Sequence, residues 1–178
     1  MTYKLKRFIK YLKRQVENHS LYLWGGQGEY VEKKGRVDMQ FIASMEQSAG
    51  TAKAVADKII DCYKNGFNMA KARFFDCSGL GVYFFLKYGF IEHDMTAAEL
   101  YHRCKTHPSP DQLQPGDMVF KAKTANGYGH VGYVSGYDET SGEPLITESR
   151  GRAYGVQERV YSVGEWIDTG RTNWFDAA

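Results

Sequence analysis

At 178 residues, the chain has the length of a single domain with a full hydrophobic core. Its 43% hydrophobic and 25% charged residues are ordinary for a globular protein, and a net charge of +2 is too small to indicate nucleic-acid binding. There is no apolar run of about 18 residues for a membrane span. The basic start of the chain lacks the apolar segment and cleavage site of a secretory signal, so we expect synthesis in the cytoplasm.

Residues 3–18 have the apolar spacing of an amphipathic helix. The side opposite the apolar stripe carries six basic residues: Lys4, Lys6, Arg7, Lys10, Lys13 and Arg14. The simpler interpretation is a helix docked on the core with a solvated basic face. The alternative is a weak contact between this face and an anionic surface.

The next segments predict a turn and two helices. Gly25 and Gly26 follow aromatic residues, which indicates a turn where the backbone passes close to another segment. Residues 38–65 have helical spacing in two pieces, with Gly50 and Thr51 between them and Gly66 as the stop. Cys62 falls on the apolar stripe of the second piece, so we interpret it as a core residue.

A cysteine stands at the head of the most apolar predicted helix. Asp76, Cys77, Ser78 and Gly79 precede the apolar run 80–86, and we expect a helix over 78–88 with Asp76 as its N-cap and Gly89 as its stop. Free N–H groups and the helix dipole lower the pKa of a thiol at such a position. We therefore expect Cys77 to be a reactive nucleophile, although a cysteine there is often only packed.

The second half of the chain changes from helix to strand. Thr96 and Glu99 have capping-box spacing at the start of a helix over 97–104. Five short β-like runs follow residue 108, at 118–122, 130–135, 145–149, 156–161 and 173–175. This order predicts an α+β fold in which one antiparallel sheet packs on the central helix. His102, Cys104 and His107 lack the spacing of a metal site, and we expect neither a metal nor a cofactor.

His130 heads one predicted strand, and Glu148 lies near the end of the next. If the Cys77 helix packs on this sheet, His130 would take the thiol proton and Glu148 would orient the imidazole ring. Each residue has a simpler interpretation, since His130 is a lone strand histidine and Glu148 has cationic Arg150 nearby.

The joint pattern resembles the NlpC-type cysteine peptidases, which cut the peptide stems of bacterial cell walls on a reduced papain-like fold. The matching blocks run from about residue 20 to 160 and are Tyr22-Leu23-Trp24-Gly25-Gly26, Phe75-Asp76-Cys77-Ser78-Gly79-Leu80, Thr96-Ala97-Ala98-Glu99-Leu100, Leu113-Gln114-Pro115-Gly116-Asp117 and Gly129-His130-Val131-Gly132. Together the D-C-S-G-L, L-x-P-G-D and G-H-V-G blocks form a specific signature.

The resemblance implies a role for each matching residue. Cys77 would be the nucleophile, His130 the base and Glu148 the third polar residue, where the family often has histidine. Tyr22 would help to hold the oxyanion or the substrate. Asp76 and Ser78 would bind the free amino end of a stem peptide.

The resemblance also implies an architecture and an activity. We expect one catalytic domain over 1–178, with a helical insert at about 30–73 that departs from the family's short loop. The implied reaction is hydrolysis of the γ-D-glutamyl to diaminopimelate or lysine amide through a thioester. An N-acetylmuramoyl-L-alanine amidase, an acyltransferase or a non-catalytic wall-binding module remain as alternatives. The implied partner is the peptidoglycan stem peptide, which the protein would reach after its release, as a phage lysin does.

Overall fold

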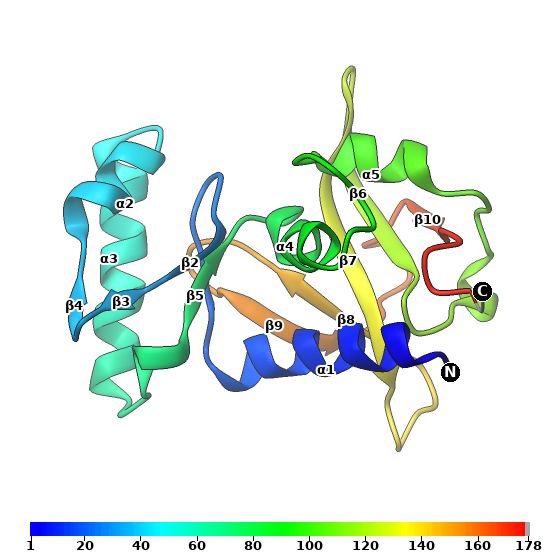
Figure 1. The fold of residues 1–178 in the computed structure, drawn as a ribbon, viewed down its shortest axis with the longest axis horizontal. Coiled ribbons are helices and arrows are strands. Elements are labelled where there is room, and N and C mark those ends of the chain that lie inside the picture. Colours follow the sequence, from blue (N-terminus) through cyan, green and yellow to red (C-terminus); the bar gives the residue numbers. More distant parts are fainter. Residues whose placement is uncertain (177–178) are drawn as a thin grey trace.

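The computed structural model describes residues 1–176 and has an α+β architecture (Figure 1). The helices are α1 (Tyr3–Glu17), α2 (Met39–Met45), α3 (Ala49–Lys64), α4 (Gly79–Lys87) and α5 (Ala97–Arg103), with short 3-10 turns at Met69–Lys71 and Pro110–Gln112. The strands of the first half are β1 (Leu21–Tyr22), β2 (Gln27–Tyr30), β3 (Glu32–Lys33), β4 (Arg36–Val37) and β5 (Arg73–Phe75). Those of the second half are β6 (Met118–Thr124), β7 (Gly127–Tyr137), β8 (Pro144–Ser149), β9 (Val156–Val160) and β10 (Asp168–Gly170).

The main sheet has five strands in the order β10-β6-β7-β8-β9, and every neighbouring pair is antiparallel. This is the expected meander, except at its last strand. The predicted strand at 173–175 is wrong: the edge strand is β10, which pairs with Met118–Phe120 of β6. Which segment joins a sheet depends on its backbone hydrogen bonds to the edge strand. These bonds cannot be inferred from the strand propensity of three residues.

The central helix α4 packs on this sheet, with α1 beside it (Figure 1). α4 and α1 contribute Leu80, Phe84, Phe85, Phe8 and Leu12 to the larger of the hydrophobic clusters. Gly81 of α4 faces Tyr133 of β7 so closely that a Cβ atom at this position would overlap the tyrosine ring. The Tyr133 hydroxyl donates a hydrogen bond to the Ser78 carbonyl at 3.1 Å. The start of α4 is therefore held directly against β7.

A second hydrophobic cluster is formed around α2 and α3, at the left of Figure 1. Its members include Ile42, Val55 and Ile59 from the helices and Phe74 from β5, and Cys62 is buried among them as expected. The two-helix prediction for 38–65 is confirmed, but the break is misplaced. Gly50 and Thr51 lie in the first turn of α3, because the Ser48 and Thr51 side chains form a capping box that starts the helix at Ala49.

A small sheet with the order β1-β5-β2 joins the two clusters and leads into α4. The Gly25–Gly26 turn lies against β5, as the glycine pair predicts: the Gly26 carbonyl accepts a hydrogen bond from Asp76 N–H at 3.0 Å. A Cβ atom at Gly79 would collide with the same carbonyl. None of the helices within residues 1–176 is long and apolar enough to cross a membrane.

Candidate active site

Cys77 lies between the end of β5 and the first residue of α4. The Asp76 carboxylate caps the helix, since its Oδ1 accepts hydrogen bonds from Gly79 N–H at 2.6 Å and from the Ser78 hydroxyl at 3.2 Å. The N-cap position expected for Asp76 is wrong, because α4 begins at Gly79, one residue later than predicted, and Ser78 is its N-cap; the capping hydrogen bond nevertheless comes from the Asp76 carboxylate. The cap fixes the turn that presents the Cys77 side chain to the main sheet.

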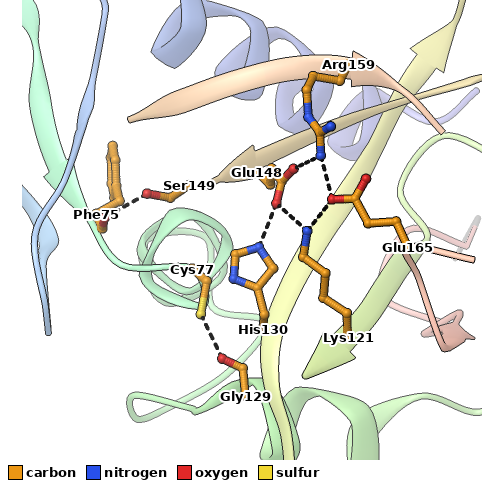
Figure 2. A network of polar contacts seen from close by, with 9 residues as sticks. All are labelled: Phe75, Cys77, Lys121, Gly129, His130, Glu148, Ser149, Arg159 and Glu165. Atoms are coloured by element: carbon orange, nitrogen blue, oxygen red, sulfur yellow. Dashed lines mark hydrogen bonds and ion pairs between the residues drawn. The ribbon is translucent and has the colours of Figure 1, made fainter. Parts of the chain in front are cut away.

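The Cys77 sulfur lies against β7 at residues 129–131. Its thiol donates to the Gly129 carbonyl at 3.6 Å, and the Val131 N–H also approaches the sulfur. His130 lies between these two residues, and Figure 2 shows its ring between Cys77 and Glu148. The helix tip and the strand thus bring together the thiol and the imidazole that are 53 positions apart in the chain (130 − 77).

Glu148 holds the far nitrogen of the imidazole ring. His130 Nε2 is 2.7 Å from Glu148 Oε2, and the glutamate is completely buried. Burial raises the pKa of this carboxyl, but hydrogen bonds from His130 and Arg159 outweigh it and lower the pKa to about 2. Glu148 is therefore ionised and can only accept, so Nε2 carries the proton. In the neutral ring the basic nitrogen is then Nδ1, which faces Cys77 in Figure 2.

Two cations and a second carboxylate surround Glu148 (Figure 2). Arg159 donates to Glu148 Oε1 at 2.6 Å, and Lys121 Nζ lies 3.3 Å from Oε2. Glu165 binds the same two cations, at 2.6 Å from Lys121 and 2.7 Å from Arg159. These four side chains, the charge cluster, balance two positive with two negative charges. The buried carboxylate is therefore compensated even while His130 is neutral.

Sequence reasoning missed Lys121, Arg159 and Glu165. Lys121 pairs with His130 across β6 and β7, which places both side chains on one face of the sheet. Arg159 pairs with Ile146, two residues from Glu148, and so shares the Glu148 face. A lone lysine in the apolar start of β6 was the available signal, but only the strand register shows what it faces. The cation near Glu148 in sequence, Arg150, is not among its partners.

The expectation of a lowered pKa for Cys77 is wrong. Burial raises the pKa of the thiol to about 11, and the neighbouring Asp76 carboxylate adds to the rise. N–H groups of Val131, Ser78 and Cys77 itself act in the opposite direction but are outweighed. The resting sulfur is therefore a protonated thiol, whose hydrogen bond to the Gly129 carbonyl is consistent with that state.

The structure brings Tyr22 into the same neighbourhood. Burial raises the pKa of its hydroxyl, and the charges of Cys77 and Asp76 raise it further. The Arg152 guanidinium lies 5.2 Å from the centre of the Tyr22 ring. Arg152 is bound in turn by Glu46, whose other oxygen accepts from Trp24 N–H at 3.1 Å. Glu46, at the end of α2, thus supports the segment that follows Tyr22.

The sequence profile of the NlpC/P60 family matches residues 62–168, which include Cys77, His130 and Glu148. The chain belongs to the NlpC/P60 family. A search of curated protein sequences finds no match.

Solved structures of NlpC/P60 proteins have the same fold. The P60 domain of an antigen from Mycobacterium avium subspecies paratuberculosis superposes with a TM-score of 0.51 at 20% identity, over 94% of this chain and 96% of that one. The peptidoglycan hydrolase RipB of Mycobacterium tuberculosis gives 0.52 at 18% identity, over 94% and 66%. RipD of the same organism, a non-catalytic peptidoglycan-binding NlpC/P60 protein, gives 0.53 at 16% identity, over 96% and 98%.

A buried hydrogen bond between the two sheets helps this NlpC/P60 domain to align Glu148 with Cys77. The residue after Glu148, Ser149, donates its hydroxyl proton to the Phe75 carbonyl at 2.8 Å, and both residues are buried. This bond ties the end of β8 to the end of β5, two residues before the cysteine (Figure 2). The buried bond therefore fixes the strand end that carries Glu148 relative to the strand end that precedes Cys77.

Proposed function

We propose that this NlpC/P60 domain is a cysteine hydrolase that cleaves an amide bond in peptidoglycan stem peptides. The observation that carries the proposal is the hydrogen bond from His130 to ionised Glu148, because it leaves Nδ1 free as a base on the side of Cys77.

The reaction starts from the neutral thiol. Nδ1 of His130 takes the thiol proton while the sulfur attacks the carbonyl carbon, so no resting thiolate is required. When the C–N bond breaks, the imidazolium returns this proton to the departing amine and a thioester remains. Water then attacks the thioester, Nδ1 takes a proton from the water, and the restored thiolate receives it as the carboxylic acid leaves.

The charge that develops on the carbonyl oxygen needs hydrogen-bond donors. The Cys77 backbone N–H at the helix tip and the Tyr22 hydroxyl are our candidates. Because burial raises the pKa of Tyr22, its hydroxyl stays protonated and able to donate at neutral pH. Asp76 and Ser78 would meet the free amino end of the stem, next to the nucleophile.

The bond that we propose is the γ-D-glutamyl amide to diaminopimelate or lysine. The proposed site of action is the bacterial cell wall, which the protein would reach after its release, as a phage lysin does. The test is digestion of purified walls, followed by mass spectrometry of the fragments. A new amino terminus on diaminopimelate or lysine supports the endopeptidase, whereas a free lactyl carboxylate indicates a muramoyl-alanine amidase. Thioester transfer to an added amine would indicate an acyltransferase.

Cys77→Ala should abolish the digestion, and Cys104→Ala is the matched control. The Cys104 thiol is also partly buried and also bonds to a backbone carbonyl, that of Leu100 at 3.4 Å, but it lies outside the site. Equal activity of Cys77→Ala and the parent protein would refute the mechanism.

One observation favours a second candidate, a non-catalytic wall-binding domain. A thiol with a pKa of about 11 is a poor spontaneous nucleophile, and the similar structure RipD is described as a non-catalytic peptidoglycan binder. The two candidates separate in one measurement: wall pelleting with no released fragments supports the binding domain, and fragment release supports the hydrolase.

A further inference from the structure

A wide groove of the structure lies away from Cys77. It is a groove of about 1040 Å³ between α1 on one side and β2, β5 and α4 on the other, and its lining includes neither His130 nor Glu148. A volume of this size suits a ligand of several linked units.

Seven cationic side chains line this groove, here called the basic groove, against one carboxylate, Glu17. Lys6, Arg7, Lys10 and Arg14 come from α1. Lys71, Arg73 and Lys87 come from the opposite wall. The whole chain has a net charge of only +2, so this concentration of positive charge is local.

These cations have no carboxylate partners within residues 1–176. Tyrosine rings hold two of the three arginines instead, one on each wall. Arg7 lies 4.6 Å from the centre of the Tyr88 ring and bonds to its hydroxyl at 2.7 Å. Arg73 lies 3.8 Å above the Tyr30 ring and donates to the Gly28 carbonyl. The guanidinium groups are thus oriented in advance while their charge stays uncompensated.

We propose that the basic groove binds a linear polymer with repeated phosphodiesters, of the kind attached to bacterial cell walls. Cations on two facing walls can neutralise successive phosphates of a single thin chain. A flat bilayer would reach the exposed face of α1 but not Arg73, which is partly buried on the opposite wall. A nucleic-acid duplex is much wider than one polymer chain. The assignment of this polymer to the cell wall rests on the proposed function. The binding of phosphodiesters does not depend on that function.

The test is fluorescence anisotropy with labelled synthetic poly(glycerol phosphate) between 50 and 200 mM salt. Removing one cation that binds a phosphate should make the slope of log K against log salt shallower by about 0.7–0.9, the value known for nucleic-acid phosphates. The double variant Lys10→Gln/Arg73→Gln should bind at least about tenfold more weakly, with a slope shallower by about twice that amount. Lys64→Gln, which removes an exposed charge of α3 outside the groove, should bind as the parent does.

Cys77→Ala should bind the polymer like the parent, so that failure of the hydrolase proposal leaves this result unchanged. Should the Arg73 change unfold the protein, Lys6→Gln/Lys10→Gln on the exposed face of α1 carries the same test. No binding at 50 mM salt, or equal weakening by Lys64→Gln, would overturn the proposal. Tighter binding to phosphatidylglycerol vesicles or to a DNA duplex than to poly(glycerol phosphate) would overturn it as well.

Discussion

Replacing Glu148 by glutamine should place the proton on the wrong nitrogen of His130. The amide has one acceptor and one donor where the carboxylate has two acceptors, which serve Arg159 at 2.6 Å and His130 at 2.7 Å. Arg159 can only donate, whereas an imidazole can accept by exchanging tautomers. Lys121 can also only donate, but its contact with the oxygen that faces His130 is longer, at 3.3 Å, and it keeps Glu165 as an acceptor at 2.6 Å. We therefore expect the amide oxygen of Glu148→Gln to face Arg159 and its NH₂ group to face Nε2. Nδ1 then carries the proton and cannot act as a base toward Cys77.

The corresponding carboxylate-to-amide change in a serine hydrolase lowers kcat by about 10⁴, because it selects the wrong tautomer. The same reduction here would correspond to about 5 kcal/mol of transition-state stabilisation. The assay is kcat/KM for release of diaminopimelate from a synthetic stem peptide. The ¹⁵N chemical shifts of labelled His130 report directly which nitrogen is protonated.

Glu165→Gln is the matched control for charge. It removes a carboxylate from the same two cations but leaves the bond between Glu148 and His130 intact. We expect it to lower kcat/KM by less than about tenfold and to keep the proton on Nε2. Glu148→Gln activity within tenfold of the parent, or an unchanged ¹⁵N pattern in that variant, would refute the tautomer reasoning.

Three further predictions concern ionisation and packing. The pKa of Glu148 is about 2 in the folded chain against 4.5 for a free glutamate, which corresponds to about 3 kcal/mol. Because this pKa is lowered, the contribution is complete above pH 4.5 and disappears as pH falls toward 2. Urea unfolding should show that Glu148→Gln loses about 3 kcal/mol less than the parent over this pH range. The decrease common to both comes from other carboxyls with lowered pKa values, such as Glu165 and Asp168. Alkylation of Cys77 by iodoacetamide, followed by peptide mass spectrometry, should accelerate about tenfold per pH unit from pH 7 to 10, and a plateau below pH 8 would contradict the raised pKa of about 11. Gly81→Ala should destabilise the fold by about 1–3 kcal/mol because its Cβ overlaps Tyr133, whereas Gly50→Ala, whose Cβ has room, should not destabilise it; equal midpoints in thermal unfolding would contradict this packing.

Periodicity and capping signals were sufficient for the elements that carry the site. The helix after Cys77, the strands that hold His130 and Glu148, and the Thr96–Glu99 capping box depend on local spacing that sequence displays directly. Cys77, His130 and Glu148 could be grouped from the sequence because one apolar helix must pack on one sheet.

The remaining features depend on contacts between distant segments. Lys121 and Arg159 reach Glu148 only through strand register, and β10 replaces the predicted last strand through pairing with β6. The pKa of Cys77 illustrates the limit most clearly. Position at a helix start is visible in sequence and lowers a thiol pKa, but the burial that raises it to about 11 depends on the packed structure.

The contact between Glu46 and Arg152 has a consequence for engineering the domain. Glu46 closes α2, and its buried carboxylate satisfies both the Arg152 guanidinium and the Trp24 N–H. Grafting a short loop in place of residues 30–73 would leave a cation and an amide without their acceptor beside Tyr22. A minimised version of this protein would therefore need a substitute anion at that point, or a neutral residue in place of Arg152.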